Sequence, residues 1–199
     1  MNRMIQFALP AVAVAVALSI GCKHSKAENH EQHAKKMAAE AGKVAVAKVQ
    51  PAKAATTQPA WGKSSGTVTF TQLEGGQVKV AVDLQGVPPG AHGFHIHEKA
   101  DLSAADLTSA GAHFNPGGHK HGGPETSERH AGDLGNLDAD TSGNIKKELT
   151  VEGLSVGTGA ANDVIGHSVI LHAKADDLKT DPSGNSGGRI AGGAIEAKK

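Results

Sequence analysis

The sequence contains one cysteine, Cys22, among 199 residues, so no intrachain disulfide can form. It also lacks a dominant sign of charge, because 20 Lys and Arg residues balance 20 Asp and Glu residues. Without a net field the chain is not suited to recruit nucleic acid, and any electrostatic function must be local. Aromatic residues make up only 3% of the chain, whereas glycine occurs 26 times. This composition favours a single turn-rich β domain.

Long hydrophobic runs are also missing, with one exception near the N-terminus. Residues 5–20 form an apolar run after Arg3 that is too short for a comfortable transmembrane helix, so residues 1–21 are predicted to be a signal peptide. The run ends in LSIGC at residues 18–22, which resembles a bacterial lipoprotein signal that places a lipid on Cys22. Because Leu18 lies one place further from the cysteine than usual, a plain secretory signal is the alternative.

Residues 22–42 are rich in Lys, Glu, Ala and His and have no apolar stripe for a core. We predict that they form a flexible, lipid-anchored tether before a folded domain at residues 43–199. The tether histidines, His24, His30 and His33, either help to gather metal ions or are simply solvated, and the composition favours the second interpretation.

Alternating, β-branched segments recur through the rest of the chain and predict about eight strands. They lie at residues 43–49, 66–71, 77–84, 91–98, 130–137, 144–151, 164–173 and 189–196. Only residues 104–110 show a competing helical pattern, and that pattern is short. Closely spaced strands without long crossover helices predict an all-β, antiparallel sandwich or barrel of the immunoglobulin-like class.

Residues 99–129 have no periodicity and are rich in Gly, Pro and His, and a loop of this length in a compact domain is usually functional. Just before it, His95 and His97 alternate in a predicted strand, so their side chains emerge on the same face. Together with His113 and His172 they offer up to four imidazoles. Four nitrogen donors suit cupric copper, and imidazole also tolerates the cuprous state. This set predicts a redox-active copper site.

A second donor set lies in and just after the same loop, with three imidazoles and one carboxylate. Its members are His113, His121, His130 and Asp133. Such a set is a closed tetrahedral complement for zinc and is typical of structural sites. It leaves no position for an activated water, which argues against a hydrolytic zinc enzyme. His113 belongs to both sets because an imidazole has two ring nitrogens, although the residues alone do not establish a bridge.

Six segments together resemble the motifs of copper/zinc superoxide dismutases. They are AHGFHIHE at 91–98, GAHFNP at 111–116, KHGGP at 120–124, RHAGDLGN at 129–136, HAKADDL at 172–178 and GNSGGR at 184–189. They occur in the family's order, and the resemblance extends from about residue 66 to the C-terminus. It implies an eight-stranded Greek-key β-barrel with long metal-binding loops, and the dismutation of superoxide to dioxygen and hydrogen peroxide.

The resemblance also implies roles for individual residues. His95, His97, His113 and His172 would be copper ligands, and His113, His121, His130 and Asp133 zinc ligands, with His113 as the bridge. Asp176 would join a copper ligand to a zinc ligand, and Arg189 would attract superoxide beside the copper. His92 would be structural. His119 and His167 match no family ligand, so both are expected to be exposed or loosely packed.

This chain departs from the family pattern where relatives carry a disulfide, because Leu107 and Gly192 occupy those two positions. We expect zinc binding and apolar packing to stabilise the long loop instead. The predicted location is the periplasm or the cell surface, and relatives occur as both homodimers and monomers. The alternative function is a non-catalytic protein that binds or delivers copper and zinc outside the cytoplasm.

Overall fold

The computed structural model describes residues 30, 32–33, 35–36, 40, 42–55 and 61–199. The chain divides into two compact units, residues 1–36 and residues 37–199. In the first unit, His30 and His33 have helical backbone and exposed side chains. Cys22, His24 and the predicted signal peptide lie outside the described residues. Within the described part of the chain, no helix has both the length and the apolar character needed to cross a membrane.

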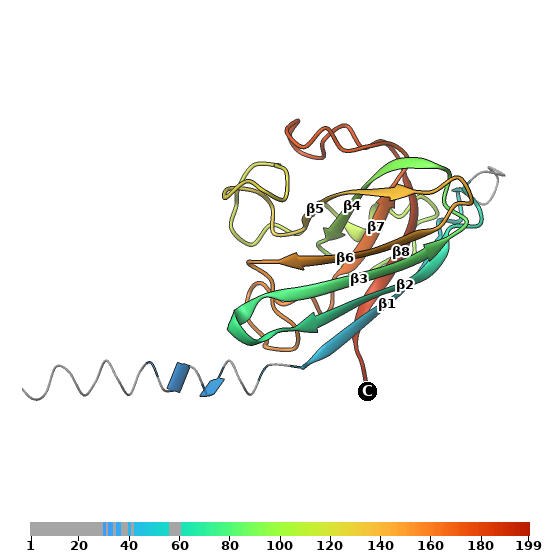
Figure 1. The fold of residues 1–199 in the computed structure, drawn as a ribbon. Coiled ribbons are helices and arrows are strands. Elements are labelled where there is room, and N and C mark those ends of the chain that lie inside the picture. Colours follow the sequence, from blue (N-terminus) through green and yellow to red (C-terminus); the bar gives the residue numbers. More distant parts are fainter. Residues whose placement is uncertain (1–29, 31, 34, 37–39, 41, 56–60) are drawn as a thin grey trace, which may run out of the picture. The chain divides into compact units, whose positions relative to one another are not determined.

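The second unit is built from strands (Figure 1). They are β1 (Val44–Pro51), β2 (Ser65–Gln72), β3 (Val78–Gln85), β4 (Gly90–His97), β5 (Asp133–Ala139), β6 (Ile145–Val151), β7 (Ser168–His172) and β8 (Arg189–Ala197). Within residues 61–199, the helical elements are two short 3-10 turns, η2 (Glu74–Gly76) and η3 (Thr108–Ala110).

All neighbouring strands pair antiparallel, in the order β5-β4-β7-β8-β1-β2-β3-β6. The two end strands, β5 and β6, are joined by a tight turn in which the Asp140 N–H donates to the Asn144 carbonyl over 3.0 Å. This turn brings the ends of the sheet together into a nearly closed barrel. Because β3 and β4 follow each other in the chain but not in the sheet, the connection is of the Greek-key type. The predicted all-β fold is confirmed.

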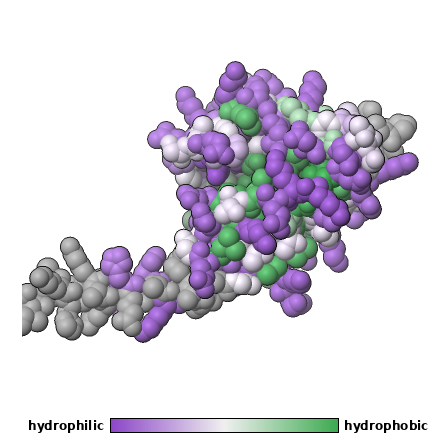
Figure 2. Space-filling view, in the orientation of Figure 1, coloured by the Kyte–Doolittle hydropathy of each residue, from purple (hydrophilic) through white to green (hydrophobic). Residues whose placement is uncertain are grey.

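Burial alternates along the strands, as side chains that point to opposite faces of a sheet require. In β3, the side chains of Val78, Val80, Val82 and Leu84 are buried in the core and their neighbours are more exposed. On the face shown in Figure 2 the outer surface of this unit is mostly hydrophilic. Leu178 is the one large hydrophobic side chain exposed among the described residues. The core therefore sits inside the barrel.

Strand β4 departs from this alternation, and the departure positions the site. Phe94 and Ile96 belong to the hydrophobic core, so His95 and His97 point to the opposite face. Both histidines are nevertheless buried. Long connections at residues 98–132 and 173–188 flank this part of the barrel, and residues of both contact the two rings. The outer face of β4 is thus enclosed by loops.

Most strand boundaries lie within one or two residues of their predicted positions, and the larger differences from the sequence predictions include the following. β5 begins at Asp133 rather than residue 130, because the Asp133 N–H donates to the His130 carbonyl in a turn. β7 begins at Ser168 rather than residue 164, after a turn in which the His167 N–H donates to the Val164 carbonyl. The helical pattern at 104–110 yields only η3, because Leu107 has left-handed backbone with φ 62°.

Candidate metal centre

A small backbone network brings three distant segments to one place. The Phe114 N–H donates to the Ile96 carbonyl, the Ile96 N–H to the Gly132 carbonyl, and the Gly132 N–H to the Phe114 carbonyl, over 2.8 to 2.9 Å. A side chain at Gly132 would clash with the Ile96 carbonyl, so only glycine allows this approach. Because these residues adjoin His95, His97, His113, His130 and Asp133, the network fixes the backbone of most of the site.

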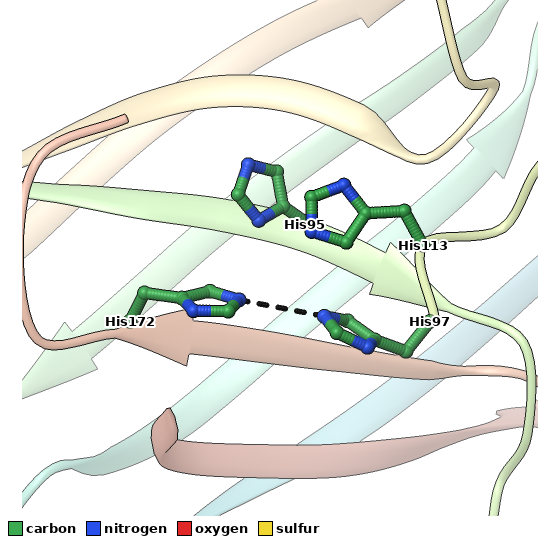
Figure 3. Close-up of side chains that lie close together, drawn as sticks. All are labelled: His95, His97, His113 and His172. Carbon is green, nitrogen blue, oxygen red and sulfur yellow. Dashed lines mark hydrogen bonds between the residues drawn. The ribbon is translucent and has the colours of Figure 1, made fainter. Parts of the chain in front are cut away.

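Four of the predicted ligands, His95, His97, His113 and His172, lie together (Figure 3). His95 and His97 come from β4, His172 from the end of β7, and His113 from the loop, where it forms a β-bridge with His97. The His95 and His113 ring centroids are 4.0 Å apart. All four side chains are buried, and one ligand nitrogen of each lies within 4.8 Å of those of the other three.

The hydrogen bonds around this cluster leave lone pairs facing inward. His97 Nδ1 donates to the Gly111 carbonyl over 3.0 Å, and His172 Nδ1 donates to the Gly187 carbonyl over 3.1 Å. A neutral imidazole with one protonated nitrogen carries a lone pair on the other. The two Nε2 atoms, 3.4 Å apart, therefore face each other as acceptors. Buried His95 Nδ1 and His113 Nε2 have no hydrogen-bond partner. A metal cation coordinated by these four nitrogens would give each buried lone pair a partner.

The second predicted set, His113, His121, His130 and Asp133, also converges. Asp133 Oδ2 accepts hydrogen bonds from the backbone N–H groups of Gly122 and His130, each over 3.1 Å. Its Oδ1 is surrounded by the Nδ1 atoms of His113, His121 and His130 at 2.8, 3.1 and 3.3 Å. Three imidazole nitrogens around one carboxylate oxygen fit a four-coordinate zinc site.

Asp176 links the two clusters. Its Oδ2 accepts from His95 Nε2 over 2.8 Å, and its Oδ1 accepts from His121 Nε2 over 3.0 Å. Because both Nε2 atoms are donors, the lone pairs of both rings are on Nδ1, the two buried atoms without hydrogen-bond partners. A side chain at Gly184, which has φ 61°, would clash with Asp176 Oδ1. Glycine is required there for the bridge to form.

Asn136 holds the backbone of Asp176 from both sides. The Asn136 side-chain amide donates to the Asp176 carbonyl over 2.9 Å, and its oxygen accepts from the Asp176 N–H over 2.8 Å. This pair connects β5, which begins at the ligand candidate Asp133, to the 173–188 connection. The sequence pattern alone predicts no such role for Asn136. The residue stands in the RHAGDLGN motif, but a backbone contact of this kind leaves no pattern in a sequence.

Burial sets the protonation of the copper-side histidines. It is the largest influence on His95, His97 and His172 and lowers their pKa values from 6.5 to about 4, 2 and 3. For His97 the neighbouring charges of His113 and Arg189 add to the effect, whereas for His95 the hydrogen bond to Asp176 partly offsets it. These rings are neutral at pH 7, which is the form that binds a metal ion.

The carboxylates are held ionised. Burial is the strongest influence on Asp133 and would raise its pKa, but hydrogen bonds from His113 and the Gly122 N–H outweigh it and lower the pKa from 3.8 to about 2. For Asp176 burial likewise opposes ionisation, and the hydrogen bond from His95 reverses the effect, so its pKa is also lowered. The centre therefore combines neutral imidazoles with two negative charges, which suits divalent cations.

Arg189 reaches the same centre from the start of β8. Its guanidinium is half-buried and donates to the Leu107 carbonyl over 2.6 Å through Nη1 and to the Gly111 carbonyl over 2.7 Å through Nη2. Desolvation by burial lowers its pKa, although an arginine keeps its charge at any ordinary pH. Sequence analysis identified Arg189 but not the two carbonyl groups that orient it.

The remaining histidines of this unit lie outside the clusters. His92 is buried, with its ring nitrogens 2.8 Å from the carbonyl oxygens of His172 and Pro88. His119 is exposed. His167 is partly exposed, with Nδ1 2.7 Å from the Glu98 carbonyl and its ring 4.0 Å from that of Phe114. His167 is thus more firmly packed than the sequence suggested.

Comparison with known proteins agrees with this geometry. Residues 64–195 match the family model described as copper/zinc superoxide dismutase. The chain belongs to this family. It is 48% identical over 140 residues to an extracellular Cu-Zn superoxide dismutase of Drosophila melanogaster, covering 67% of this chain and 76% of the relative. A crystal structure of the clock protein EA4 is also similar, with a TM-score of 0.68 and 38% identity, covering 79% of this chain and 96% of that one.

Membership of the copper/zinc superoxide dismutase family makes this chain an oxidoreductase and names the metals that its two clusters accommodate. The buried imidazoles with inward lone pairs fit copper, and the cluster that contains Asp133 fits zinc. Family, fold, enzyme class and metals thus agree with the sequence analysis.

Proposed function

We propose that the protein dismutates superoxide to dioxygen and hydrogen peroxide with the residue roles given next. His95, His97, His113 and His172 hold copper. His113, His121, His130 and Asp133 hold zinc. The observation that carries this assignment is the position of His113, whose Nδ1 lies 2.8 Å from Asp133 while its buried Nε2 has no hydrogen-bond partner. One ring thus belongs to both clusters, and its two nitrogens can serve different metals.

Copper, when bound, supplies the one-electron redox chemistry that dismutation requires. The protein supplies orientation and charge. Asp176 fixes the rings of His95 and His121 through their Nε2 atoms. Arg189 carries the positive charge that draws in the substrate anion, and two carbonyl groups fix its guanidinium. His113 Nε2, buried and without a hydrogen-bond partner, faces the copper cluster, and when it is not bound to copper it can hold a proton for the product peroxide.

The test compares metal content and superoxide removal in the full chain and in two variants. His113→Ala should lose activity and bind less of both metals, because it removes a donor from each cluster. His119→Ala is the matched control, an exposed histidine of the same loop, and should keep both activity and metals. A wild-type protein that binds both metals but does not remove superoxide would instead indicate the alternative function, storage or delivery of copper and zinc.

We also propose that residues 1–21 are a signal peptide, that Cys22 carries the lipid, and that residues 22–42 tether the enzyme domain at residues 43–199 to a membrane at the periplasm or cell surface. The extracellular description of the Drosophila relative supports export. The expected experiment is metabolic labelling with a tagged fatty acid. Wild-type protein should be labelled and Cys22→Ala should not, and an unlabelled wild type would favour the plain secretory signal.

The oligomeric state is a separate proposal, namely a homodimer of the enzyme domain. Relatives with the same motifs occur as dimers and as monomers, so the proposal needs a direct measurement. Sedimentation of the metal-loaded chain over a concentration series should give twice the chain mass. A constant monomer mass would reject it.

A further inference from the structure

Leu107 combines two features that rarely occur together. It has left-handed backbone with φ 62°, a conformation that residues with a branched side chain usually avoid, and its side chain is only 5% exposed. It directly precedes η3 in the long loop, and Arg189 is the first residue of β8. A conformation of this kind persists only where the surroundings hold it in place.

The backbone around Leu107 orients the guanidinium of Arg189. The Leu107 carbonyl accepts from Nη1 over 2.6 Å, and the Gly111 carbonyl, at the other end of η3, accepts from Nη2 over 2.7 Å. Both acceptors therefore belong to one short segment, residues 107–111. If this segment moves relative to β8, the guanidinium loses its fixed direction.

The side chain of Leu107 attaches that segment to the barrel. It packs in a second apolar cluster, separate from the main core, which consists of Ala52, Ala55, Leu107, Ala110 and Ile170 with Trp61 and Leu102 at its edge. Its Cδ1 atom lies 3.2 Å from the position that a Cβ on Gly192 would occupy. Gly192 lies in β8, three residues after Arg189. Because Gly192 has no side chain, it leaves room for the side chain of Leu107.

We propose that Leu107 is a positioning residue for Arg189. Its side chain anchors the 107–111 segment against β8 and so keeps its own carbonyl directed at the guanidinium. The inference rests on the proposed role of Arg189 in attracting superoxide. It assigns an influence on anion capture to a buried aliphatic side chain that belongs to neither metal cluster.

The experiment uses the copper- and zinc-loaded full chain and measures metal content, superoxide removal and the affinity for azide, a small anion, by absorption titration. Leu107→Ala should keep its metals and bind azide about fivefold more weakly, the factor that one ordinary hydrogen bond is worth, with a similar fall in the rate of superoxide removal. Leu107→Met, which keeps the apolar volume, should stay within twofold of wild type.

Leu102→Ala is the matched control, because Leu102 packs against the same cluster and its carbonyl accepts no hydrogen bond from Arg189. It should lower thermal stability but leave azide affinity within twofold. Equal azide affinities for Leu107→Ala and Leu102→Ala would overturn the inference. Arg189→Ala separates the two proposals, because unchanged azide affinity in that variant would reject the role of Arg189 itself.

A second substitution tests the same proposal without creating a cavity, because a cavity at Leu107 could prevent folding. In Gly192→Ala the new Cβ would lie 2.8 Å from Ile170 Cδ1, 3.1 Å from the Val169 carbonyl oxygen and 3.2 Å from Leu107 Cδ1, so Ile170 must shift and Leu107 must give way by a few tenths of an ångström. The variant should weaken azide binding in the same direction as Leu107→Ala while both metals stay bound. Wild-type azide affinity in a folded Gly192→Ala protein would contradict the proposal.

Discussion

His97 and Arg189 donate hydrogen bonds to the same acceptor, the Gly111 carbonyl oxygen, over 3.0 and 2.7 Å. One residue is a proposed copper ligand and the other the proposed anion-binding group. A single peptide therefore sets the tautomer of the ligand and the direction of the positive charge. Because the Ala112 N–H donates to the Glu98 carboxylate over 3.2 Å, the same segment is also held to the end of β4. If His97 and Arg189 have the proposed roles, the backbone of residues 111–112 couples metal binding to substrate capture.

Replacing Arg189 with lysine tests whether direction matters as well as charge. Lysine keeps the positive charge but cannot donate to two separate carbonyl groups in the fixed fork of a guanidinium. We expect Arg189→Lys to bind both metals normally and to remove superoxide about tenfold more slowly, within the range that electrostatic steering contributes to association rates. Stopped-flow measurements over a series of salt concentrations check this, and a wild-type rate at every concentration would show that the hydrogen bonds are irrelevant.

Replacing Asp176 tests the link between the clusters. In Asp176→Asn the charge is lost and one of the two acceptors becomes a donor, so His95 and His121 cannot both keep their present tautomers. We expect zinc affinity to fall 10- to 100-fold, the usual cost of losing such an outer partner of a metal ligand. Competition with a zinc chelator measures it. Asp177→Asn is the matched control, because the carboxylate of partly exposed Asp177 accepts hydrogen bonds only from Lys179, Thr180 and Asn185. An equal loss there would rule out the link.

Much of this fold and site follows from local sequence pattern. Alternation along β3 and β4 predicts strands, and the one-residue spacing of His95 and His97 predicts a shared face, because both depend only on the geometry of a strand. The donor sets follow from residue type and from the family motifs. The first residues of β5 and β7 cannot be predicted from local pattern, because backbone hydrogen bonds to the carbonyls of His130 and Val164 form turns that delay both strands.

Contacts through backbone carbonyls are the part that sequence pattern does not reveal. Any residue type can present a carbonyl, so nothing in the sequence singles out Gly111 as the acceptor shared by His97 and Arg189. The left-handed conformation of Leu107 is also invisible, since leucine normally avoids it. The two hydrogen bonds between the Asn136 side chain and the Asp176 backbone likewise join segments that meet only in the folded chain.

The other loop histidines provide a test of selectivity. His119 is exposed and the ring of His167 bonds only the Glu98 carbonyl, whereas His121 points its Nδ1 at Asp133. We expect His119→Ala and His167→Ala to keep full copper and zinc, and His121→Ala to lose most of its zinc. Elemental analysis after gel filtration gives the metal content. Loss of one equivalent of copper or zinc in His119→Ala or His167→Ala would show that the proposed ligand sets are incomplete.

Removing the metals should destabilise the fold strongly. In both clusters buried lone pairs face one another, and no disulfide restrains the long loop. A ligand present at a thousand times its dissociation constant contributes about 4 kcal/mol, which for a domain of this size corresponds to a shift of about 10 °C or more in the melting temperature. Calorimetry before and after chelation measures the shift. Restoration by zinc and copper together is the control, and equal melting temperatures would show that the loop is stable without metals.

Acid should destabilise the metal-free protein, and the pKa values fix the sign. An unfolded chain binds protons at histidine below about pH 6.5, whereas burial holds the folded-state pKa of His95 near 4 and those of His172 and His97 near 3 and 2. Between these limits the unfolded state carries more protons, so the free energy of unfolding falls as pH falls, by up to about 1.4 kcal/mol per pH unit for each histidine.

Urea unfolding of the chelated full chain at pH 7, 6 and 5 measures this slope directly. Asp133 adds to it only in stronger acid, because its folded-state pKa of about 2 lies below its ordinary value of 3.8. His97→Gln should flatten the slope between pH 6 and 5, because it removes one of the buried rings. A metal-free protein equally stable at pH 7 and pH 5 would mean that these rings accept protons in the folded state, and the lone pairs on which both clusters depend would not be held in place.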